Sequence, residues 1–384
     1  MATLGRFLRV PSESFFLFGP RGTGKTTWLK REIPDGLFLN LLQPDVFRSL
    51  NARPERLREL VLGNPEKKDV IVDEVQRAPE LLPVVHDLME SGTNRRFVMT
   101  GSSARKLRRA GTDLLAGRAL LRTMHPFMAA ELPDFDLDTS LKLGMVPLVV
   151  MADNPPDVMA SYASLYLEQE VQAEGLVRSI GSFARFLEAV SFSHAAVLNV
   201  SNVARDAQIS RKTVEGFFEI LEDLLLAFRL PVFTRRAQRA TAAHPKFYLF
   251  DTGVFRSLRP AGPLDRPQEI EGAALEGLVA QHLRAWIAYS QLDLELFYWR
   301  TRSGAKVDFV VYGSDGFWAV EVKSSAIVRR EDVRSLRTFI KDYPACEPLL
   351  LHRGSERLLI DGVKCAPAAE FLSALRPNQT LADL

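Results

Sequence analysis

The chain has 384 residues, and its 49 Lys and Arg residues nearly balance its 47 Asp and Glu residues, which leaves a net charge of +2. At about 100–200 residues per domain, this length predicts two or three domains. A content of 47% hydrophobic and 25% charged residues is that of an ordinary globular protein and excludes a collagen-like, mucin-like or wholly disordered chain.

We expect no segment of the chain to enter a membrane. The longest strongly apolar stretch, Leu143–Ala152, is about half as long as a bilayer requires and contains Pro147. The N-terminus shows no apolar core of a secretion signal, and two cysteines, Cys346 and Cys365, are too few for a four-thiolate zinc site. These features predict a cytoplasmic protein.

Two proline-rich breaks, 153–157 and 260–267, divide the chain into three predicted domains, 1–152, 153–260 and 261–384. The first alternates helical patterns with short apolar runs, which is typical of a parallel sheet flanked by helices. Those runs are Ser14–Phe18, Leu37–Leu41, Val70–Val72 and Phe97–Thr100. The middle domain is helical in period, and the last combines helices with strands, so we expect an α/β protein.

Residues 19–26 read GPRGTGKT and fit the P-loop pattern G-x-x-x-x-G-K-[ST] between a predicted strand and a predicted helix. Glycines let successive backbone N–H groups turn toward phosphates, and the helix N-terminus adds its positive end. Lys25 would neutralise the terminal phosphates of ATP, and the Thr26 hydroxyl would ligate Mg²⁺. The predicted nucleotide-binding residues are Gly19, Pro20, Arg21, Gly22, Thr23, Gly24, Lys25, Thr26 and Thr27.

Two adjacent acids, Asp73 and Glu74, follow the apolar run Val70–Val72. Asp73 would hold Mg²⁺ through water, and Glu74 would polarise the attacking water. The alternative is that these acids simply begin a loop. After the next strand, either Thr100 or Ser102 could hydrogen-bond the γ-phosphate or the water.

Arg118 is a candidate for the cation that reaches the γ-phosphate of a neighbouring subunit. The alternatives are an ordinary surface arginine and a contact with a lid. An arginine supplied from a neighbour completes the site only at a subunit interface. We therefore expect a homo-oligomer, a ring of six subunits formed with ATP.

The order of motifs resembles that of the bacterial and archaeal AAA+ ATPases that carry a C-terminal restriction-nuclease-like domain. The segments that carry the resemblance include GPRGTGKTT, VIVDEVQRAPELL, VMTGSSARKL, LLAGRALLRTMHPF, YLEQE (166–170), YLFDTG (248–253), EGLV (276–279), FYWR (297–300), VDF (307–309) and VEVK (320–323). The chain departs from the relatives at 144–147, where GMVP replaces their usual Gly-Gly-x-Pro turn. The resemblance implies the fold more than the biological role.

Residues 200–225 have the pattern of a helix–turn–helix, with Ser201 and Ser210 as expected helix caps. Arg211 and Lys212 would lie at the exposed start of the second helix, where DNA-recognition residues belong. Strands at 230–234 and 246–250 would form a wing, with Arg235, Arg236 and Arg239 between them. The alternative is a structural or protein-docking unit.

In the last domain, 307–312 and 317–323 form a predicted hairpin that places Asp308 opposite Glu321 if Tyr312 faces Phe317. Like charges opposed across a sheet are unfavourable, but a divalent cation between them would compensate. Glu276 on the preceding helix would supply a third carboxylate, and Lys323 would orient water or stabilise charge. This set, with Asp308, Glu321 and Lys323 as catalytic residues, resembles the PD-(D/E)XK phosphodiesterase core.

Two stretches are strongly basic: 95–122 has eight basic residues against one acid, and 229–259 has seven against one. They are compatible with polyanion binding and equally with a solvated face. Two hypotheses follow. The first is an Mg²⁺-dependent ATPase that binds or remodels DNA, with metal-dependent nuclease activity as a further expectation. The second is an ATP-driven protein-binding switch whose C-terminal domains are docking or DNA-binding platforms that do not cleave.

Overall fold

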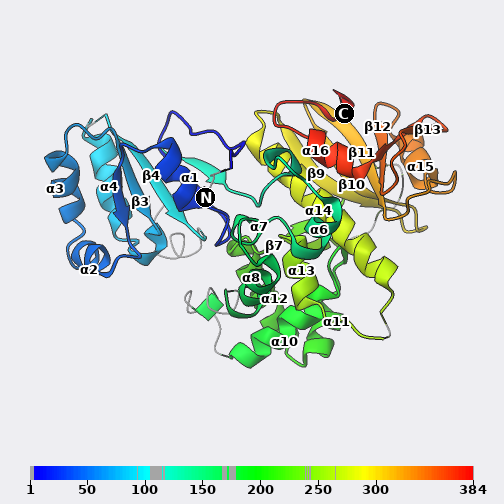
Figure 1. Cartoon of the computed structure of the whole chain (residues 1–384), viewed down its shortest axis with the longest axis horizontal. Helices are drawn as coiled ribbons and strands as arrows, with labels where there is room; N and C mark the ends of the chain where they lie inside the picture. The colour runs from blue at the N-terminus through cyan, green and yellow to red at the C-terminus, as the bar shows by residue number, and fades with distance from the viewer. Residues whose placement is uncertain are drawn as a thin grey trace. The chain divides into compact units, whose positions relative to one another are not determined.

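The structure is a computed structural model that describes residues 4–92, 94–103, 115, 117–166, 171–172, 179–237, 239, 241, 244–263 and 265–383. The chain divides into two compact units (Figure 1). The P-loop unit comprises Leu8–His125 and Asp223–Leu225, and the second unit comprises Met1–Phe7, Pro126–Glu222 and Leu226–Leu384. The predicted boundaries after residues 152 and 260 both lie within the second unit, and the three-domain division stays a prediction.

The P-loop unit contains a five-stranded parallel sheet in the order β2-β3-β4-β1-β5. The strands are β1 (Phe15–Phe18), β2 (Leu37–Asn40), β3 (Asp69–Asp73), β4 (Arg96–Gly101) and β5 (Leu120–Thr123). The first four confirm the strands that apolar runs predict. The sequence did not indicate β5, since its residues are only partly buried and form no apolar run bounded by turn signals.

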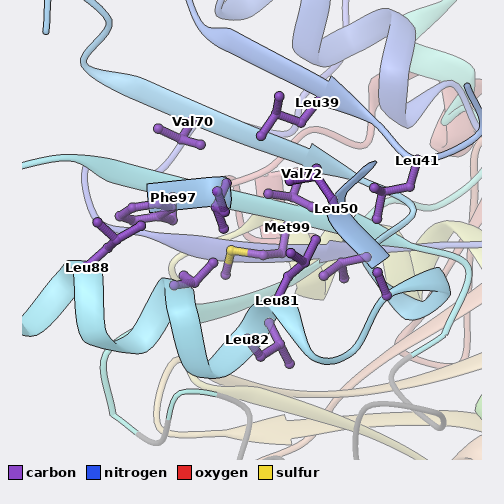
Figure 2. Close-up of a cluster of buried hydrophobic side chains, with 14 of the residues drawn as sticks. Leu39, Leu41, Leu50, Val70, Val72, Leu81, Leu82, Leu88, Phe97 and Met99 are labelled. Atoms are coloured by element: carbon purple, nitrogen blue, oxygen red, sulfur yellow. The ribbon is translucent and has the colours of Figure 1, made fainter. Parts of the chain in front are cut away.

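The helices of this unit are α1 (Lys25–Glu32), α2 (Pro44–Ala52), α3 (Arg56–Gly63) and α4 (Leu81–Glu90), and a short 3-10 helix, η1, spans Val75–Arg77. Figure 2 shows Leu81, Leu82 and Leu88 on α4 beside Phe97 and Met99 of β4. Burial of these side chains stabilises the sheet, at roughly 1.5–3 kcal/mol for each large apolar side chain. The ends of β1, β3 and β4 that carry the predicted site residues therefore rest on a continuous core.

In the second unit, short helices precede a helical region and a small antiparallel sheet, β6-β8-β7. The early elements are η2 (Ala129–Glu131), α6 (Leu137–Leu143), α7 (Pro147–Val150), α8 (Pro155–Ser161) and the π-helix η3 (Tyr162–Tyr166). They are followed by α10 (Ile180–Ser191), β6 (Ala196–Val197), α11 (Val200–Ala207), α12 (Arg211–Asp223), β7 (Ala227–Leu230), β8 (Lys246–Leu249) and α13 (Thr252–Leu258). Residues 167–170 of the YLEQE segment lie outside the described residues.

One of the two expected helix caps is present in the structure. Ser210 precedes α12 and its hydroxyl accepts a hydrogen bond from the backbone N–H of Thr213, as predicted. Ser201 does not cap α11, because that helix begins at Val200 and the side chain of Asn199 accepts from the N–H of Asn202. The inward face of α12 carries Val214, Phe217, Phe218 and Leu221, all of which are buried.

A six-stranded sheet in the order β13-β14-β12-β11-β10-β9 completes the second unit. Its elements are α14 (Pro267–Tyr289), β9 (Leu294–Arg300), β10 (Lys306–Gly313), β11 (Gly316–Lys323), α15 (Arg334–Asp342), β12 (Glu347–His352), β13 (Leu358–Ile360), β14 (Val363–Pro367) and α16 (Ala368–Ala374). A last 3-10 helix, η4, spans Leu381–Asp383. In the described parts of the chain, no helix combines the length and apolar character needed to cross a membrane.

Gly144, which the turn Gly144-Met-Val-Pro147 shares with the relatives, has a clear structural role. Gly144 ends α6 with φ +72, and a Cβ there would clash with the carboxylate of Asp251. Asp251 in turn accepts hydrogen bonds from the N–H groups of Met145, Gly253 and Val254, so that it caps α13 and binds the turn. The absence of a side chain at Gly144 therefore allows Asp251, in the YLFDTG segment, to approach the turn closely.

Candidate functional site

The loop between β1 and α1 has the backbone conformation that its glycines allow. Gly22 and Gly24 adopt φ values of +82 and +87, in the left-handed region that favours glycine. A Cβ on Gly19 would lie 2.5 Å from the carbonyl oxygen of Met124, so a larger residue there would displace the loop. Gly24 is also the residue before the first turn of α1, where backbone N–H groups lack intrahelical partners.

Lys25 is largely buried, with 7% of its surface exposed. Its Nζ donates hydrogen bonds to the carbonyl oxygens of Gly19, at 2.7 Å, and Pro20, at 3.2 Å. The Thr23 hydroxyl also donates to the carbonyl of Pro20, at 2.7 Å. The ammonium group is therefore folded back over the loop, among the residues predicted to surround the phosphates.

Thr26, Asp73 and Thr100 come together although they lie in α1, β3 and β4. The Thr26 hydroxyl donates to Asp73 Oδ2 at 2.9 Å, and the Thr100 hydroxyl donates to Asp73 Oδ1. Asp73 is buried, with 1% of its surface exposed. The sequence predicted Thr26 and Asp73 as Mg²⁺ ligands and either Thr100 or Ser102 as a partner of the γ-phosphate or the water. The structure brings Thr26, Asp73 and Thr100 into one hydrogen-bonded set, and the roles stay predictions.

This set fits Mg²⁺ by the chemistry of its donors. Mg²⁺ prefers hard oxygen ligands and is usually held by one or two carboxylates together with substrate phosphates and waters. Asp73 supplies the carboxylate and Thr26 the hydroxyl, and the hydrogen bond between them shows that both can face one point.

Glu74 lies at the end of the same strand with φ +62, an uncommon backbone conformation for a residue other than glycine. Its backbone N–H donates to the Thr100 hydroxyl oxygen at 3.2 Å. The side-chain amide of Gln76 donates to Glu74 Oε2 at 2.6 Å and to Ser102 Oγ at 3.3 Å. Thr100 therefore contacts Asp73 and Glu74, whereas Ser102 contacts only Gln76 among these residues.

Gln76 is the residue that our reading of the sequence missed. It is buried, with 6% of its surface exposed, and a Cβ on Gly101 would clash with its Oε1. The signal was its position two residues after Glu74, on the turn that η1 forms immediately after β3. Polar side chains at that distance from a predicted catalytic carboxylate are candidates for holding it in position.

Arg118 lies in the P-loop unit and is 44% exposed at its side chain. Its guanidinium pairs with Glu90 of α4 at 2.6 Å. An exposed pair of this kind contributes about 0.2–1 kcal/mol and is readily exchanged for another anion. The role in a neighbouring subunit stays a prediction, and four basic residues of the same stretch, between 104 and 114, lie outside the described residues.

The second candidate site lies in the second unit, where the predicted hairpin has the expected register. Tyr312 faces Phe317 and Phe309 faces Val320, and the next residues along the two strands are Asp308 and Glu321. Both acids are buried, with 1% of their surfaces exposed.

Lysines accompany the three predicted acids. Lys246 of β8 lies with its Nζ 2.8 Å from Glu276 Oε1 and 3.0 Å from Asp308 Oδ1. Lys323 donates to Glu321 Oε1 at 2.8 Å, as its position two residues further along β11 predicted. The sequence did not indicate Lys246, because it lies 30 residues before the nearest of the acids that it contacts.

Burial and charge perturb these groups strongly. Burial, reinforced by the negative charge of Asp308, raises the pKa of Glu321 to about 7. Burial acts in the same direction on Asp308, but the ammonium groups of Lys246 and Lys306 outweigh it and hold the pKa of Asp308 at about 2. The pKa of Glu276 is raised, first by burial and then by Asp308.

The arrangement does not fit the predicted metal site. Among the residues that the structure describes, no group of three or more His, Cys, Asp or Glu side chains is placed to hold a metal ion. Glu276 and Asp308 instead share the ammonium of Lys246. We therefore derive no chemistry through a metal at Glu276, Asp308 and Glu321.

The predicted wing is also different in the structure. In the segment after β7, Phe233 is buried among aromatic side chains of the six-stranded sheet and α15, whereas Arg235, Arg236 and Arg239 are exposed. Arg235 pairs with Glu295 and Arg239 pairs with Asp342. The strand predicted at 230–234 lies instead at Ala227–Leu230. Two of the three arginines expected to contact phosphates are thus paired with carboxylates, although the arginine side chains remain exposed.

Comparison with known proteins supports the assignment of the P-loop unit. Residues 12–132 match the family model described as an AAA domain. Residues 134–265 and 271–371 match two other models, each described as a domain of unknown function. Together with the parallel sheet, the first match supports a P-loop AAA+ fold for this part of the chain.

Two curated relatives cover nearly the whole chain. Uncharacterized proteins of Mycobacterium bovis and Mycobacterium tuberculosis are each 26% identical over 380 residues, which is 96% of this chain and 83% of theirs. With this coverage, the matches extend into all three segments that the family models match.

Solved structures align only weakly. The replication initiator DnaA bound to AMPPCP and single-stranded DNA aligns at a TM-score of 0.27 and 10% identity, over 55% of this chain and 82% of that one. AMPPCP-bound DnaA from Aquifex aeolicus aligns at a TM-score of 0.27 and 12% identity, over 55% of this chain and 81% of that one. A type III CRISPR defence DNA nuclease activated by cyclic oligoadenylate aligns at a TM-score of 0.20 and 12% identity, over 94% of this chain and 49% of that one. These scores are too low to identify a shared fold.

Proposed function

We propose that the protein is an Mg²⁺-dependent ATPase whose reaction takes place at the P-loop. The observation that carries this proposal is the hydrogen-bonded set of Thr26, Asp73 and Thr100 next to the P-loop lysine. The match of residues 12–132 to an AAA domain supports it, since that range includes every residue of the set.

Each residue has a distinct task. Lys25 exchanges its bonds to the carbonyls of Gly19 and Pro20 for bonds to the terminal phosphates. Thr26 and Asp73 hold Mg²⁺, which when bound neutralises charge that develops on the phosphates. Glu74 accepts a proton from, or orients, the attacking water, and Thr100 fixes the backbone of Glu74 and the carboxylate of Asp73.

Two substitutions test this assignment. Lys25→Ala should abolish binding of a fluorescent ATP analogue, and Glu74→Gln should retain the nucleotide while losing hydrolysis. The matched control is Lys30→Ala, which removes an exposed lysine from the same helix and should leave both measurements unchanged. Unchanged ATPase rates in both site variants would remove the proposal.

We further propose that ATP hydrolysis is coupled to DNA binding or remodelling through residues 180–249. Support comes from the order helix, strand, helix, helix, strand, strand in α10 to β8 and from the sheet order β6-β8-β7, an arrangement compatible with a winged helix. Arg211 and Lys212 are exposed at the start of α12. Arg211, however, already pairs with Glu215.

The paired arginines after β7 favour the second candidate function, an ATP-driven protein-binding switch. A titration of fluorescent duplex, single-stranded and branched DNA across a range of salt concentrations separates the two. Phosphate-dominated binding should weaken by roughly a decade or more as salt rises fourfold, and Lys212→Glu should weaken it further. Lys364→Glu, at an exposed position on β14, is the control. Absence of binding at low salt would favour the switch.

The proposed oligomer is a ring in which Arg118 reaches the nucleotide of a neighbouring subunit. Mixing Arg118→Ala subunits into the wild-type protein should lower the ATPase rate more than in proportion to their fraction. A linear decrease would mean that each chain hydrolyses ATP alone.

A further inference from the structure

Lys246 lies at the centre of the buried acidic cluster of the second unit. It begins β8, and 4% of its surface is exposed. Its Nζ contacts carboxylate oxygens from two different elements, Glu276 of α14 and Asp308 of β10. A cation that bridges two carboxylates in this way occupies the kind of position that a divalent ion would otherwise take.

With all three acids ionised, the charges of the cluster balance. The carboxylates of Glu276, Asp308 and Glu321 are matched by three ammonium groups, those of Lys246, Lys306 and Lys323. A divalent ion added to this set would leave an excess of positive charge in a buried region. Uncompensated buried charge is strongly unfavourable, so metal entry would require Lys246, the buried ammonium between Glu276 and Asp308, to leave.

Several of the carboxylate oxygens that a metal would need also accept hydrogen bonds already. Asp308 Oδ1 accepts from Lys246, and Oδ2 accepts from the backbone N–H of Val322 at 3.1 Å. Glu276 Oε1 accepts both from Lys246 and from the Tyr248 hydroxyl, at 2.6 Å. Glu321 Oε2 is an exception, because this buried oxygen has no hydrogen-bond partner among the described residues.

We infer that Lys246 is the resident cation of the Glu276–Asp308–Glu321 cluster and keeps divalent metal out of it. The cluster is then an ion-pair network that joins β8 to α14 and β10, and the second unit does not carry out metal-dependent cleavage of nucleic acid. This inference is independent of the proposed ATPase function, because no residue of the cluster belongs to the P-loop unit.

The inference predicts that a metal site appears when the lysine is removed. Thermal unfolding of the full-length, nucleotide-free chain should show no effect of Mn²⁺ on the wild-type midpoint. Lys246→Ala should unfold at a lower temperature, and Mn²⁺ should raise its midpoint by about 5 °C at a hundredfold excess over the dissociation constant. The exposed neighbour supplies the matched control, since Lys306→Ala keeps Lys246 and should stay insensitive to Mn²⁺.

The double variant Lys246→Ala/Asp308→Asn tests whether the gained ion binds in the cluster, and it should lose the response to Mn²⁺. If Lys246→Ala folds only when Mn²⁺ is present, the inference is supported. It is overturned if Lys246→Ala is indifferent to Mn²⁺. It is also overturned if nucleotide-free wild type is stabilised by Mn²⁺ and Asp308→Asn abolishes that effect. This second comparison does not depend on the folding of a lysine variant.

Discussion

The two candidate sites use the same residue types and differ in what the carboxylates contact. In the P-loop unit, hydroxyl groups of Thr26 and Thr100 bind Asp73, while the nearby lysine donates to backbone carbonyls. In the second unit, lysines bind the carboxylates directly. A hydroxyl can turn from hydrogen-bond donor to metal ligand, whereas an ammonium group must be expelled. The partner of a buried acid therefore decides whether a metal can enter, more than the acid itself does.

The largest effect that this comparison predicts is on stability. Lys246→Met keeps most of the side-chain volume but leaves Glu276 and Asp308 without their shared cation. We expect the free energy of unfolding to fall by about 3–5 kcal/mol, as for other buried ion pairs that lose one partner. Urea denaturation at pH 7 measures this. Lys306→Met, at a lysine that is half exposed, should change the same quantity by less than about 1 kcal/mol.

The corresponding change in the P-loop unit should affect activity rather than folding. Thr26→Val keeps the shape of the side chain and removes the hydroxyl that binds Asp73. We expect a loss of about 10²–10³-fold in kcat for ATP hydrolysis, comparable to the removal of another group that supports charge in a transition state. Thr139→Val, at an exposed position on α6, is the control and should stay close to wild type. Equal rates for the two variants would contradict the role assigned to Thr26.

Two buried histidines each make the stability of the second unit depend on pH. Burial lowers the pKa of His282 to about 4 and that of His194 to about 3. Each is lower in the folded chain than the ordinary value of about 6.5, so the unfolded chain binds more protons and stability falls as the pH drops below about 6.5.

The difference between wild type and His282→Gln isolates one of these groups. Between pH 7.5 and pH 5, this difference in unfolding free energy should move by about 2 kcal/mol in favour of the variant. His86→Gln, the same substitution at a half-exposed histidine of the P-loop unit, is the control for the change of side chain. Parallel stability curves for wild type and His282→Gln would show that this imidazole does not titrate on unfolding.

The smallest predicted effect concerns the orientation of Glu74. Gln76→Leu removes the amide that donates to Glu74 Oε2 at 2.6 Å. A hydrogen bond to a charged group contributes about 1.5–3 kcal/mol, so kcat should fall about tenfold or more while KM stays unchanged. Ser102→Ala removes only the longer, 3.3 Å contact of the same amide and should have a smaller effect. A larger loss in Ser102→Ala would assign the main role to Ser102.

The sequence was sufficient where a local pattern determines the outcome. The P-loop motif, the acids after β3 and the hairpin register between Tyr312 and Phe317 all depend on neighbouring residues or on counting along two strands. Buried apolar runs likewise identified the first four strands of the parallel sheet.

It was insufficient where a contact joins distant segments. Lys246 reaches Asp308 across 62 positions, and Arg239 reaches Asp342 across 103. Charge counting treated both cations as part of one basic stretch, because composition reveals the number of charges and not their partners. The same limit explains why the first strand of the wing was expected at 230–234 and not at Ala227–Leu230, since nothing local indicates that Phe233 inserts into the aromatic cluster of the six-stranded sheet.

The most direct test of the contrast between the two sites is a count of bound Mn²⁺ in wild-type protein by electron paramagnetic resonance. The measurement is made with and without a non-hydrolysable ATP analogue. The predicted result is about one Mn²⁺ per chain with the analogue and none above background without it, because Thr26 and Asp73 hold the ion together with phosphates whereas Lys246 excludes it from the acidic cluster. A stoichiometric Mn²⁺ that binds without nucleotide and persists in Lys25→Ala would contradict this account.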